Sequence, residues 1–264
     1  MKNHETAFIT GASDGIGKEL AYHFAKDGYN LVLVARSEQK MIELKQNIEK
    51  AYNVHVTIIS KDISDQEAVK EIYEEVQKKG ITIDYLVNNA GFGLFGEFVN
   101  TDINAELNMI DLNIKTVTHF TKLFLPHMVE RNKGRVLNVA STAAFQPGPL
   151  MAVYYATKSY VLSFTEALEN ELKGTNVTVT AFCPGATKTE FSSRANLGKS
   201  KLFKSGVMDV KDVAEIGYKG FMDGKTVVIS GMKNRLTAAF VRFMPRKIVT
   251  SIVRSVQEEI DTKN

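Results

Sequence analysis

A tyrosine and a lysine four residues apart form the most reactive pair in the sequence. The apolar spacing of residues 154–172 predicts a helix, so Tyr154 and Lys158 would lie on one face of it. A free tyrosine has a pKa of about 10 and transfers protons poorly at neutral pH. A neighbouring ammonium group would lower that pKa toward the working range and make the phenol a usable acid or base.

The position of a serine distinguishes this pair from a chance match. The chain contains nine tyrosines, and Tyr22 and Lys26 repeat the same spacing, but no serine at a strand end precedes that copy. Ser141, by contrast, follows an apolar run at 134–140 that predicts a buried strand. Open α/β sheets bind ligands at the carboxyl ends of their strands, where a hydroxyl group can polarise a substrate carbonyl. The three residues together favour proton transfer to a carbonyl or from an alcohol.

A glycine-rich turn near the start of the chain predicts a nucleotide site. Gly11, Gly15 and Gly17 lie between a strand expected at 6–10 and a helix expected at 17–27, with Ser13, Asp14 and Ile16 among them. Such glycines allow a tight turn, close approach of the backbone to a pyrophosphate, and close helix–strand packing. The helix start then offers unpaired amides to the phosphates. The spacing G-x-x-x-G-x-G also fits a turn that binds nothing.

The residues after the second expected strand favour NADP(H) over NAD. An acidic residue there would bind the ribose 2′-hydroxyl of NAD, whereas this sequence has Arg36, which can hold a 2′-phosphate. Arg36 could instead be a solvated loop residue. Asp14, an acid inside the phosphate turn, weakens the preference for NADP(H) slightly.

Strands and helices alternate along the whole chain and would position these residues. Several of the strands are continuous apolar runs, which predicts a parallel sheet buried on both faces. The expected strands are 6–10, 30–35, 54–60, 84–88, 134–140, 178–183 and 226–229. The expected helices are 17–27, 37–51, 64–78 (with Ser64 and Glu67 as a capping box), 102–131, 154–172 and 210–222. The fold class is therefore α/β, a Rossmann-type doubly wound parallel sheet of about seven strands with helices on both faces, in a single domain.

Composition excludes several other classes of protein. The chain has 264 residues, one cysteine and a net charge of +3, so disulfides and cysteine-rich metal sites are excluded and no metal is expected. No uncharged stretch reaches about 18 residues, and the first ten residues do not form a signal peptide. These features favour the cytoplasm. From Met232 onward the net charge is +4, which leaves −1 for the rest and gives no indication of nucleic-acid binding.

With these motifs, the sequence resembles the short-chain dehydrogenase/reductase family over roughly residues 5 to 232. Thirteen positions separate Ser141 from Tyr154, as is common in the family. The residues that carry the resemblance are the turn 10–17, Asn88, Asn89, Ala90, Gly91, Ser141, Tyr154, Lys158, Pro184 and Gly185.

The resemblance implies an oxidoreductase and a role for each site residue. Tyr154 would donate the proton, Lys158 would lower its pKa and hold the nicotinamide ribose, and Ser141 would stabilise the oxyanion. Asn113 would anchor a water-linked proton path to Lys158, although it could be only a helix-bulge residue. Asn88 and Asn89 could instead tie strands together, and Thr189 could be a loop cap. The other expected cofactor contacts are Asp62, Ile63, Asn89, Ala90, Gly91, Pro184, Gly185, Thr187 and Thr189, beside Gly11, Ser13, Asp14, Gly15, Ile16, Gly17, Arg36, Tyr154 and Lys158.

Aromatic and methionine side chains near the site favour an apolar ketone or aldehyde as substrate, 3-oxoacyl-like or steroid-like. They lie at 91–98, at 145–151 and at 191–208, where the family has its variable lid. These side chains could equally complete the core. The alternatives are a dehydrogenase of a small polar hydroxy compound and a nucleotide-sensing protein without catalysis.

The tail at 233–264 forms a basic amphipathic extension of the domain at 1–232, with two expected helices separated by Pro245. Packing of its apolar stripe on the body or on a second subunit is favoured over contact with an anionic membrane and over covering a lipid-like substrate pocket. A membrane-associated scaffold would depend on this tail alone. By analogy with the family, the chain is expected to form a homodimer or homotetramer through the helices that hold Asn113 and Tyr154.

Overall fold

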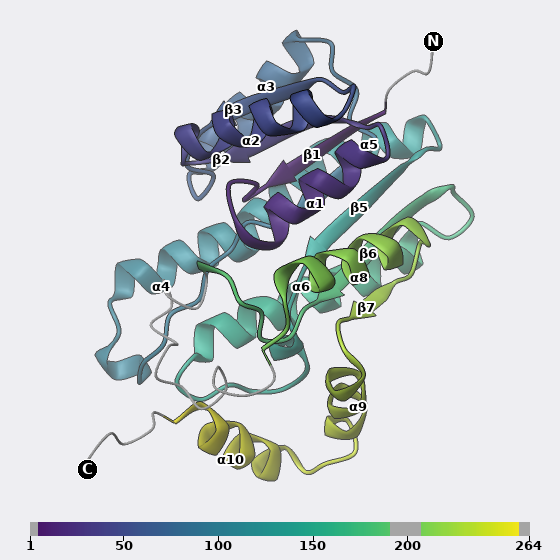
Figure 1. Ribbon diagram of the computed structural model, residues 1–264. Coiled ribbons are helices and arrows are strands. Elements are labelled where there is room, and N and C mark those ends of the chain that lie inside the picture. Colours follow the sequence, from purple (N-terminus) through teal and green to yellow (C-terminus); the bar gives the residue numbers. More distant parts are fainter. Residues whose placement is uncertain (1–4, 191–206, 259–264) are drawn as a thin grey trace.

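Seven parallel strands form one sheet in the computed structural model, which describes residues 5–190 and 207–258 (Figure 1). The strands are β1 (Thr6–Thr10), β2 (Asn30–Ala35), β3 (Val56–Ser60), β4 (Tyr85–Asn88), β5 (Gly134–Val139), β6 (Val177–Cys183) and β7 (Val227–Ile229). Their order across the sheet is β3-β2-β1-β4-β5-β6-β7, and every neighbouring pair is parallel. The order reverses between β1 and β4, which confirms the doubly wound topology that the alternating pattern predicts.

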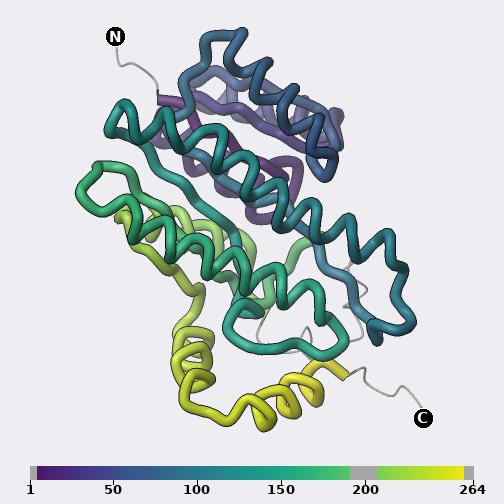
Figure 2. Tube along the Cα trace, turned by 180° about the vertical axis from the view of Figure 1, so that it is seen from behind, coloured from purple at the N-terminus to yellow at the C-terminus, as the bar shows by residue number. Residues whose placement is uncertain are grey.

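Helices cover both faces of the sheet. They are α1 (Gly15–Lys26), α2 (Glu38–Ala51), α3 (Gln66–Lys78), α4 (Ile103–Ile110), α5 (Val117–Glu130), α6 (Ala152–Glu171), α8 (Val210–Met222), α9 (Met232–Val241) and α10 (Arg246–Gln257). Phe24 of α1 and Phe221 of α8 belong to the core on one face, to which α2 also contributes. Phe8 of β1 packs with Phe120 of α5 in the core on the other face, which α3 and α6 help to cover (Figure 2). The sheet is therefore buried on both sides, as its continuous apolar strands predict.

Burial on both faces explains why the strands contain little but apolar residues. All five residues of β1 are buried, and so are five of the six residues in β2. Because all strands run in the same direction, their carboxyl ends meet along one edge. This edge collects Gly11 after β1, Arg36 after β2, Asn89 after β4, Ser141 after β5 and Pro184 after β6.

Two details of the predicted helices are wrong. The segment 102–131 is not one regular helix, because a π-helical stretch, Asp111–Thr116, separates α4 from α5. The N-cap of α3 is Asp65, whose carboxylate accepts the amide of Glu67 at 2.9 Å, while Ser64 donates its hydroxyl to Asp62 at 2.8 Å. A carboxylate competes well for this position because it accepts the free amides of the first turn.

The chain continues past β7 into α9 and α10, on either side of Pro245 (Figure 1). Ala238, Val249 and Gln257 of these helices are buried, whereas many of their other apolar residues are exposed. In the described part of the chain, no helix combines the length and hydropathy that a membrane span requires. Of the expected lid at 191–208, residues 191–206 lie outside the described residues.

Candidate active site

The glycine turn between β1 and α1 is fixed to the end of β4 by hydrogen bonds. The Thr10 hydroxyl accepts the amides of Asn89 and Ala90, each at 3.0 Å. The Asn89 side chain donates to the carbonyls of Thr10 at 2.9 Å and Gly11 at 3.2 Å. Asn89 therefore braces the turn. Asn88 donates to Asn138 and Thr121 and so ties β4 to β5 and α5, which agrees with the interpretation that this asparagine ties strands together.

The turn has the shape and the donors that a dinucleotide diphosphate needs. Gly11 and Gly15 have φ of 65° and 55°, which favour glycine. A Cβ on Gly11 would lie 2.9 Å from the Ala90 Cα, and one on Gly17 would lie 2.4 Å from the Gly11 oxygen. No side chain therefore fits at Gly11 or Gly17, and the turn presents backbone there. The amides of Ile16 and Gly17 lie in the first turn of α1, where a helix supplies no carbonyl partner, so they can bind an anion.

Asp14 and Ser13 complete the turn without opposing this fit. The Asp14 carboxylate accepts the Gly15 amide at 2.7 Å and is the N-cap of α1. Its negative charge is therefore committed to the helix start, while Ser13 stays half-buried in the turn beside it. Asp14, whose negative charge counted against NADP(H) in the sequence analysis, thus has a structural role as the cap of α1.

Arg36 extends beyond the end of β2 and pairs with Asp62 beyond β3. The guanidinium lies 3.4 Å from the Asp62 carboxylate, and the Arg36 side chain is 66% exposed. Burial raises the pKa of the Asp62 carboxyl group, but hydrogen bonds from Ser64 and the charge of Arg36 outweigh it and leave the pKa below its ordinary value. The neighbouring Ile63 is buried, and its carbonyl accepts the Thr116 hydroxyl. Asp62 thus orients the arginine at the edge of the site.

Ser141, Tyr154 and Lys158 come together at the carboxyl end of β5. Ser141 precedes a short 3-10 helix, Thr142–Phe145, and its hydroxyl accepts the Ala143 amide at 3.1 Å while bonding to the Tyr154 side chain. Tyr154 and Lys158 lie on one face of α6, with the lysine Nζ 5.8 Å from the centre of the tyrosine ring. The same Nζ donates to the Val139 carbonyl at 2.9 Å. Tyr154 is only 8% exposed and Lys158 only 5%.

Burial dominates the electrostatics of this pair. Desolvation raises the pKa of Tyr154 to about 12 although the bond from Ser141 opposes it, and desolvation lowers the pKa of Lys158 to about 8. The expectation that the lysine brings the tyrosine pKa toward neutral pH is wrong for the protein alone. The spacing correctly predicts that the two side chains are neighbours, but a low-dielectric site disfavours both charged forms.

Asn113 lies in the π-helical stretch and is fully buried. Its side-chain oxygen accepts the Phe92 amide at 3.1 Å, and its nitrogen donates to the Phe92 carbonyl at 2.9 Å and to the Thr157 hydroxyl at 3.1 Å. A Cβ on Gly91 would lie 2.9 Å from the Asn113 oxygen and 3.4 Å from the Lys158 Nζ. Asn113 and Lys158 thus flank Gly91, and the wide turn directs the asparagine to this point.

The loop after β6 returns to the glycine turn. Thr187 donates its hydroxyl to the Gly185 carbonyl at 2.9 Å, and the Pro184 carbonyl accepts the Thr142 amide at 2.9 Å. A Cβ on Gly15 would lie 3.2 Å from the Thr189 methyl carbon, so Thr189 faces the phosphate turn. The expected cofactor residues from β1, β4 and β6 are therefore gathered at one edge of the sheet.

Comparison with known proteins establishes the family. The family model described as short chain dehydrogenase matches residues 5–200. The chain is a short-chain dehydrogenase/reductase. It is 35% identical over 211 residues to an uncharacterised oxidoreductase of Staphylococcus saprophyticus, which covers 80% of this chain and 88% of that protein. It is 32% identical over 262 residues to the mouse very-long-chain 3-oxoacyl-CoA reductase, covering 96% of this chain and 81% of that one.

A solved structure extends the similarity to three dimensions. The short-chain dehydrogenase from Sphingobium yanoikuyae in complex with NADPH superposes with a TM-score of 0.82 at 29% identity, and covers 97% of this chain and 99% of that one. The chain is accordingly an oxidoreductase that acts on a CH–OH or ketone group with a nicotinamide cofactor.

Apolar side chains surround Tyr154 in this dehydrogenase/reductase. The buried members of the cluster are Met109, Ala143, Met151, Tyr154 and Tyr155. Around them pack the half-buried Phe92, Leu94, Phe95, Val153 and Val253. The segments expected to line a substrate pocket at 91–98 and 145–151 both contribute. The surroundings of the phenol are therefore mostly apolar.

Helix α10 also reaches the site, which is one of the alternatives that the sequence left open for the tail. Val253 packs on the cluster around Tyr154, and Arg254 pairs with Glu97 at 3.2 Å. Gln257 is buried and donates its side chain to the Tyr155 hydroxyl. The amphipathic spacing of 248–256 was the available signal, but it does not say which part of the body the helix contacts.

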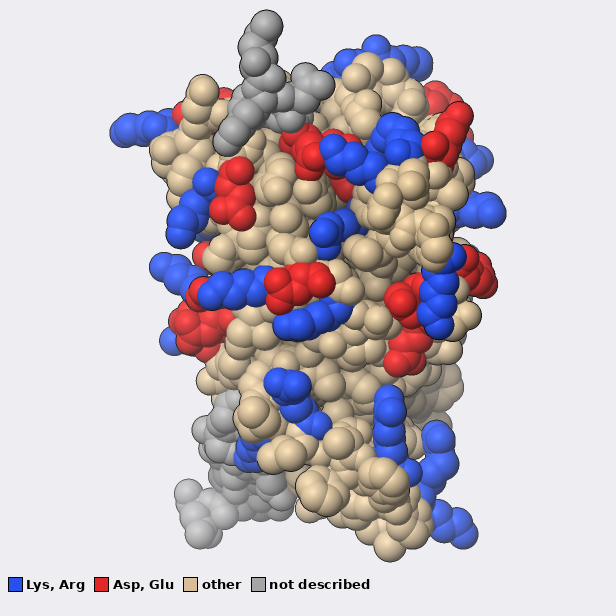
Figure 3. All heavy atoms as spheres, turned by 90° about the vertical axis from the view of Figure 1, so that its right-hand side faces the viewer, with Lys and Arg blue, Asp and Glu red and all other residues tan. Residues whose placement is uncertain are grey.

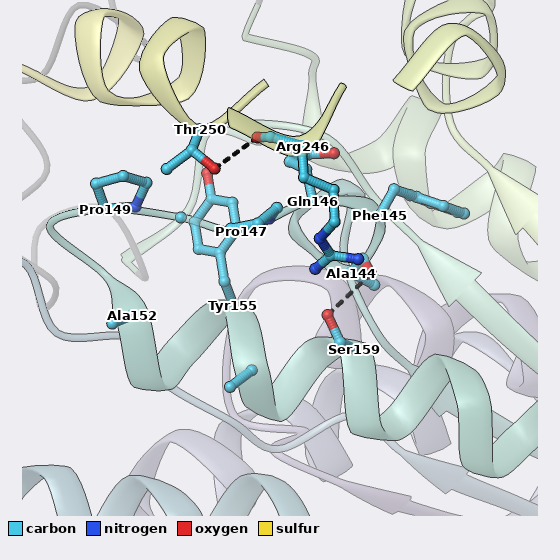
Figure 4. Close-up of a pocket in the computed structure, with 12 residues that line it drawn as sticks. Ala144, Phe145, Gln146, Pro147, Pro149, Ala152, Tyr155, Ser159, Arg246 and Thr250 are labelled. Atoms are coloured by element: carbon cyan, nitrogen blue, oxygen red, sulfur yellow. Dashed lines mark hydrogen bonds between the residues drawn. The ribbon is translucent and has the colours of Figure 1, made fainter. Parts of the chain in front are cut away.

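A hollow of about 530 Å³ lies on the opposite face of α6 and is separate from the catalytic groups (Figure 4). Tyr155 and Ser159 of α6, Pro147 of the loop before α6, and Arg246 and Thr250 of α10 line it. Ser141, Tyr154 and Lys158 do not. Within 5–190 and 207–258, no cluster of three or more histidine, cysteine or carboxylate side chains is arranged to hold a metal ion.

Proposed function

We propose that this enzyme is an NADP(H)-dependent reductase of an apolar ketone or aldehyde, of the 3-oxoacyl or steroid type. One observation carries the proposal. A buried phenol that is bonded to a serine and lies above an ammonium-bearing side chain is surrounded by apolar residues at the carboxyl edge of the sheet. Such a site can accept an apolar carbonyl compound and transfer a proton to its oxygen.

The contacts of the residues and the family resemblance together support the following roles. When bound, the nicotinamide cofactor supplies hydride to the carbonyl carbon. Tyr154 donates its proton to the carbonyl oxygen, and Ser141 bonds to that oxygen and orients it. Lys158 holds a positive charge beside the phenol and would bind the ribose hydroxyls of the cofactor. Asn113 holds the loop at Gly91, and the water-linked proton path to Lys158 that the family resemblance implies would run beside it.

The raised pKa of Tyr154 suits the reductive direction. With a pKa of about 12, the phenol keeps its proton at neutral pH. A carbonyl oxygen that gains a hydride at its carbon becomes an alkoxide, which is a stronger base than a phenolate. The proton therefore passes from Tyr154 to the product oxygen only as the reaction proceeds, as a general acid requires.

Arg36 supports the choice of NADP(H). Its exposed guanidinium lies at the end of β2, where a 2′-phosphate would be bound, and no carboxylate stands in its place. Asp62 occupies one side of the guanidinium and leaves its remaining donors for a phosphate. The presence of NADPH in the related Sphingobium structure agrees with this assignment.

The substrate class is supported by the cluster around Tyr154. Met109, Met151 and Phe95 offer no charged partner for a small hydroxy acid. Burial of apolar surface would instead favour a long-chain or ring-shaped carbonyl compound. The similarity to a reductase of very-long-chain 3-oxoacyl-CoA points the same way.

The test is the rate of NADPH and NADH oxidation with a panel of apolar ketones, aldehydes and 3-oxoacyl thioesters, and with polar keto acids as comparison. We expect NADPH to be the better cofactor and the apolar carbonyls the better substrates. Replacing Arg36 by Leu removes a charge-assisted bond and should lower kcat/KM for NADPH by about 10- to 100-fold without lowering that for NADH.

The matched control is Lys173→Leu, which removes an exposed charge in the turn after α6 and should leave both values unchanged. An enzyme that prefers NADH, or an Arg36→Leu variant that keeps its preference for NADPH, would refute the cofactor assignment. Faster turnover of the polar keto acids would refute the substrate class.

A further inference from the structure

Helix α9 and the turn after it expose a row of large apolar side chains. Met232, Leu236 and Phe240 are spaced by four residues and form one ridge on α9, and Phe243 follows in the turn. Phe240 is 65% exposed and Phe243 is 88% exposed. Ala238 on another side of the helix is buried, whereas the ridge is open to solvent and to the space toward α10. Exposing this much contiguous apolar surface to water is energetically unfavourable.

Helix α10 exposes a second ridge. Ile248, Ile252 and Val256 are again four residues apart and all are exposed. The body is contacted by an adjacent face of the helix, through the buried Val249 and Gln257. The apolar face of α10 is therefore wider than the contact with the body needs, and its outer half has no partner in the described parts of the chain.

The two helices enclose an apolar hollow between their ridges. Its volume is about 310 Å³, and Leu236, Phe240, Met244 and Ile252 are among the residues that line it. Val253 lines the hollow and also packs on the cluster that contains Tyr154. The exposed surface is thus continuous with the apolar side of the site.

The charge of this surface is strongly positive. The described segment from Met232 to Glu258 holds six basic residues and one acidic residue, which gives a net charge of +5. The basic residues are Lys233, Arg235, Arg242, Arg246, Lys247 and Arg254. Arg254 pairs with Glu97, and no carboxylate among the residues that the structure describes pairs with the other five. Figure 3 shows this end of the molecule with Lys and Arg around uncharged atoms, and with Asp and Glu higher on the same face.

We propose that α9 and α10, the C-terminal surface, bind the face of a bilayer that contains anionic lipid. The ridges would enter the acyl region at its boundary with the headgroups, while the flanking lysines and arginines contact the headgroup phosphates and carboxylates. The helices are shorter than a membrane span, so they lie along the bilayer plane.

Charge favours a bilayer over a second copy of the chain. A symmetric contact between two such surfaces would bring the five unpaired bases of one copy against the five of the other. Like charges in a closed interface repel, and their desolvation adds to the cost. An anionic bilayer supplies the opposite charge and accepts an apolar ridge of any shape.

The experiment is co-sedimentation of the full chain with vesicles of phosphatidylcholine, with or without phosphatidylserine, in the absence of cofactor and substrate. We expect pelleting with the anionic vesicles, and its loss as salt is raised to about 1 M, where the screening length is about 3 Å. A double variant, Phe240→Ser with Phe243→Ser, should reduce binding by about tenfold or more, and Arg242→Glu with Arg246→Glu should abolish the preference for anionic vesicles.

The matched controls are Val129→Ser on α5 and Lys173→Glu after α6, which change exposed residues elsewhere and should bind as the unchanged chain does. Circular dichroism checks that the variants are folded, as expected for exposed positions. No pelleting by the unchanged chain, or equal pelleting by the Phe double variant, would overturn the proposal. So would a lipid-free oligomer that dissociates in the Phe double variant, because the surface would then belong to a second copy. Since no turnover is measured, these outcomes are independent of the proposed reaction.

Discussion

Desolvation sets the protonation of the catalytic pair at the residue scale. It holds Tyr154 in its neutral form and lowers the pKa of Lys158 to about 8, so the lysine carries most of its charge at neutral pH but little above pH 9. The four-residue spacing in the sequence predicted that Tyr154 and Lys158 are neighbours. It could not predict the direction of the tyrosine shift, because burial depends on Phe92, Met109 and Val253, which come from distant parts of the chain.

The pKa of Lys158 predicts a pH dependence for reduction. Because the ammonium loses its proton as pH rises through about 8, kcat/KM for carbonyl reduction should be level below that pH and fall about tenfold for each further unit. The measurement is kcat/KM for the best substrate between about pH 6 and about pH 9.5. In a Lys158→Arg variant the guanidinium stays charged, so any remaining activity should not fall in this range. A level profile for the unchanged enzyme up to the upper limit would show that the charge of Lys158 is not required.

The π-helical stretch positions the site at the scale of elements. It lets Asn113 hold both backbone groups of Phe92, so that α4, α5 and the loop at Gly91 form one support for Lys158. The apolar pattern of 102–131 predicted the helical segment, and the wide turn agrees with the helix bulge that the sequence left open at Asn113. One extra residue moves the apolar face by about a quarter of a turn, but the spacing is helical on both sides of it, so the pattern marks the segment as helical without locating the wide turn.

Asn113→Ala tests this support. The variant leaves the amide and the carbonyl of Phe92 without partners, each at a cost of about 1–3 kcal/mol, so the free energy of unfolding should fall by about 2–6 kcal/mol. Denaturant unfolding measures it, with Asn108→Ala as the control, because Asn108 is exposed on α4 and should change the value by less than about 0.5 kcal/mol. Equal stability of the two variants would mean that the loop does not depend on Asn113.

Contacts between distant segments complete the site at the scale of the whole molecule. The alternation of strands and helices was sufficient to predict the sheet. Parallel strands bring their carboxyl ends to the same edge regardless of the length and sequence of the connecting loops. The residues that α10 contacts at the site were not predictable, since Gln257 and Tyr155 are 102 residues apart. Amphipathic spacing shows that a helix has an apolar face but not what covers it. Assembly into a homodimer or homotetramer stays a prediction.

The proposed reaction depends most on Tyr154 as the proton donor, and Tyr154→Phe tests this directly. The variant keeps the ring and its packing but removes the hydroxyl, so kcat for reduction should fall by about 10²- to 10⁴-fold while the affinity for NADPH, measured by fluorescence titration, stays within about twofold. Tyr22→Phe is the control, because Tyr22 and Lys26 have the same spacing on α1 and should be dispensable. A Tyr154→Phe enzyme that reduces the same substrate at the rate of the unchanged enzyme would contradict the account.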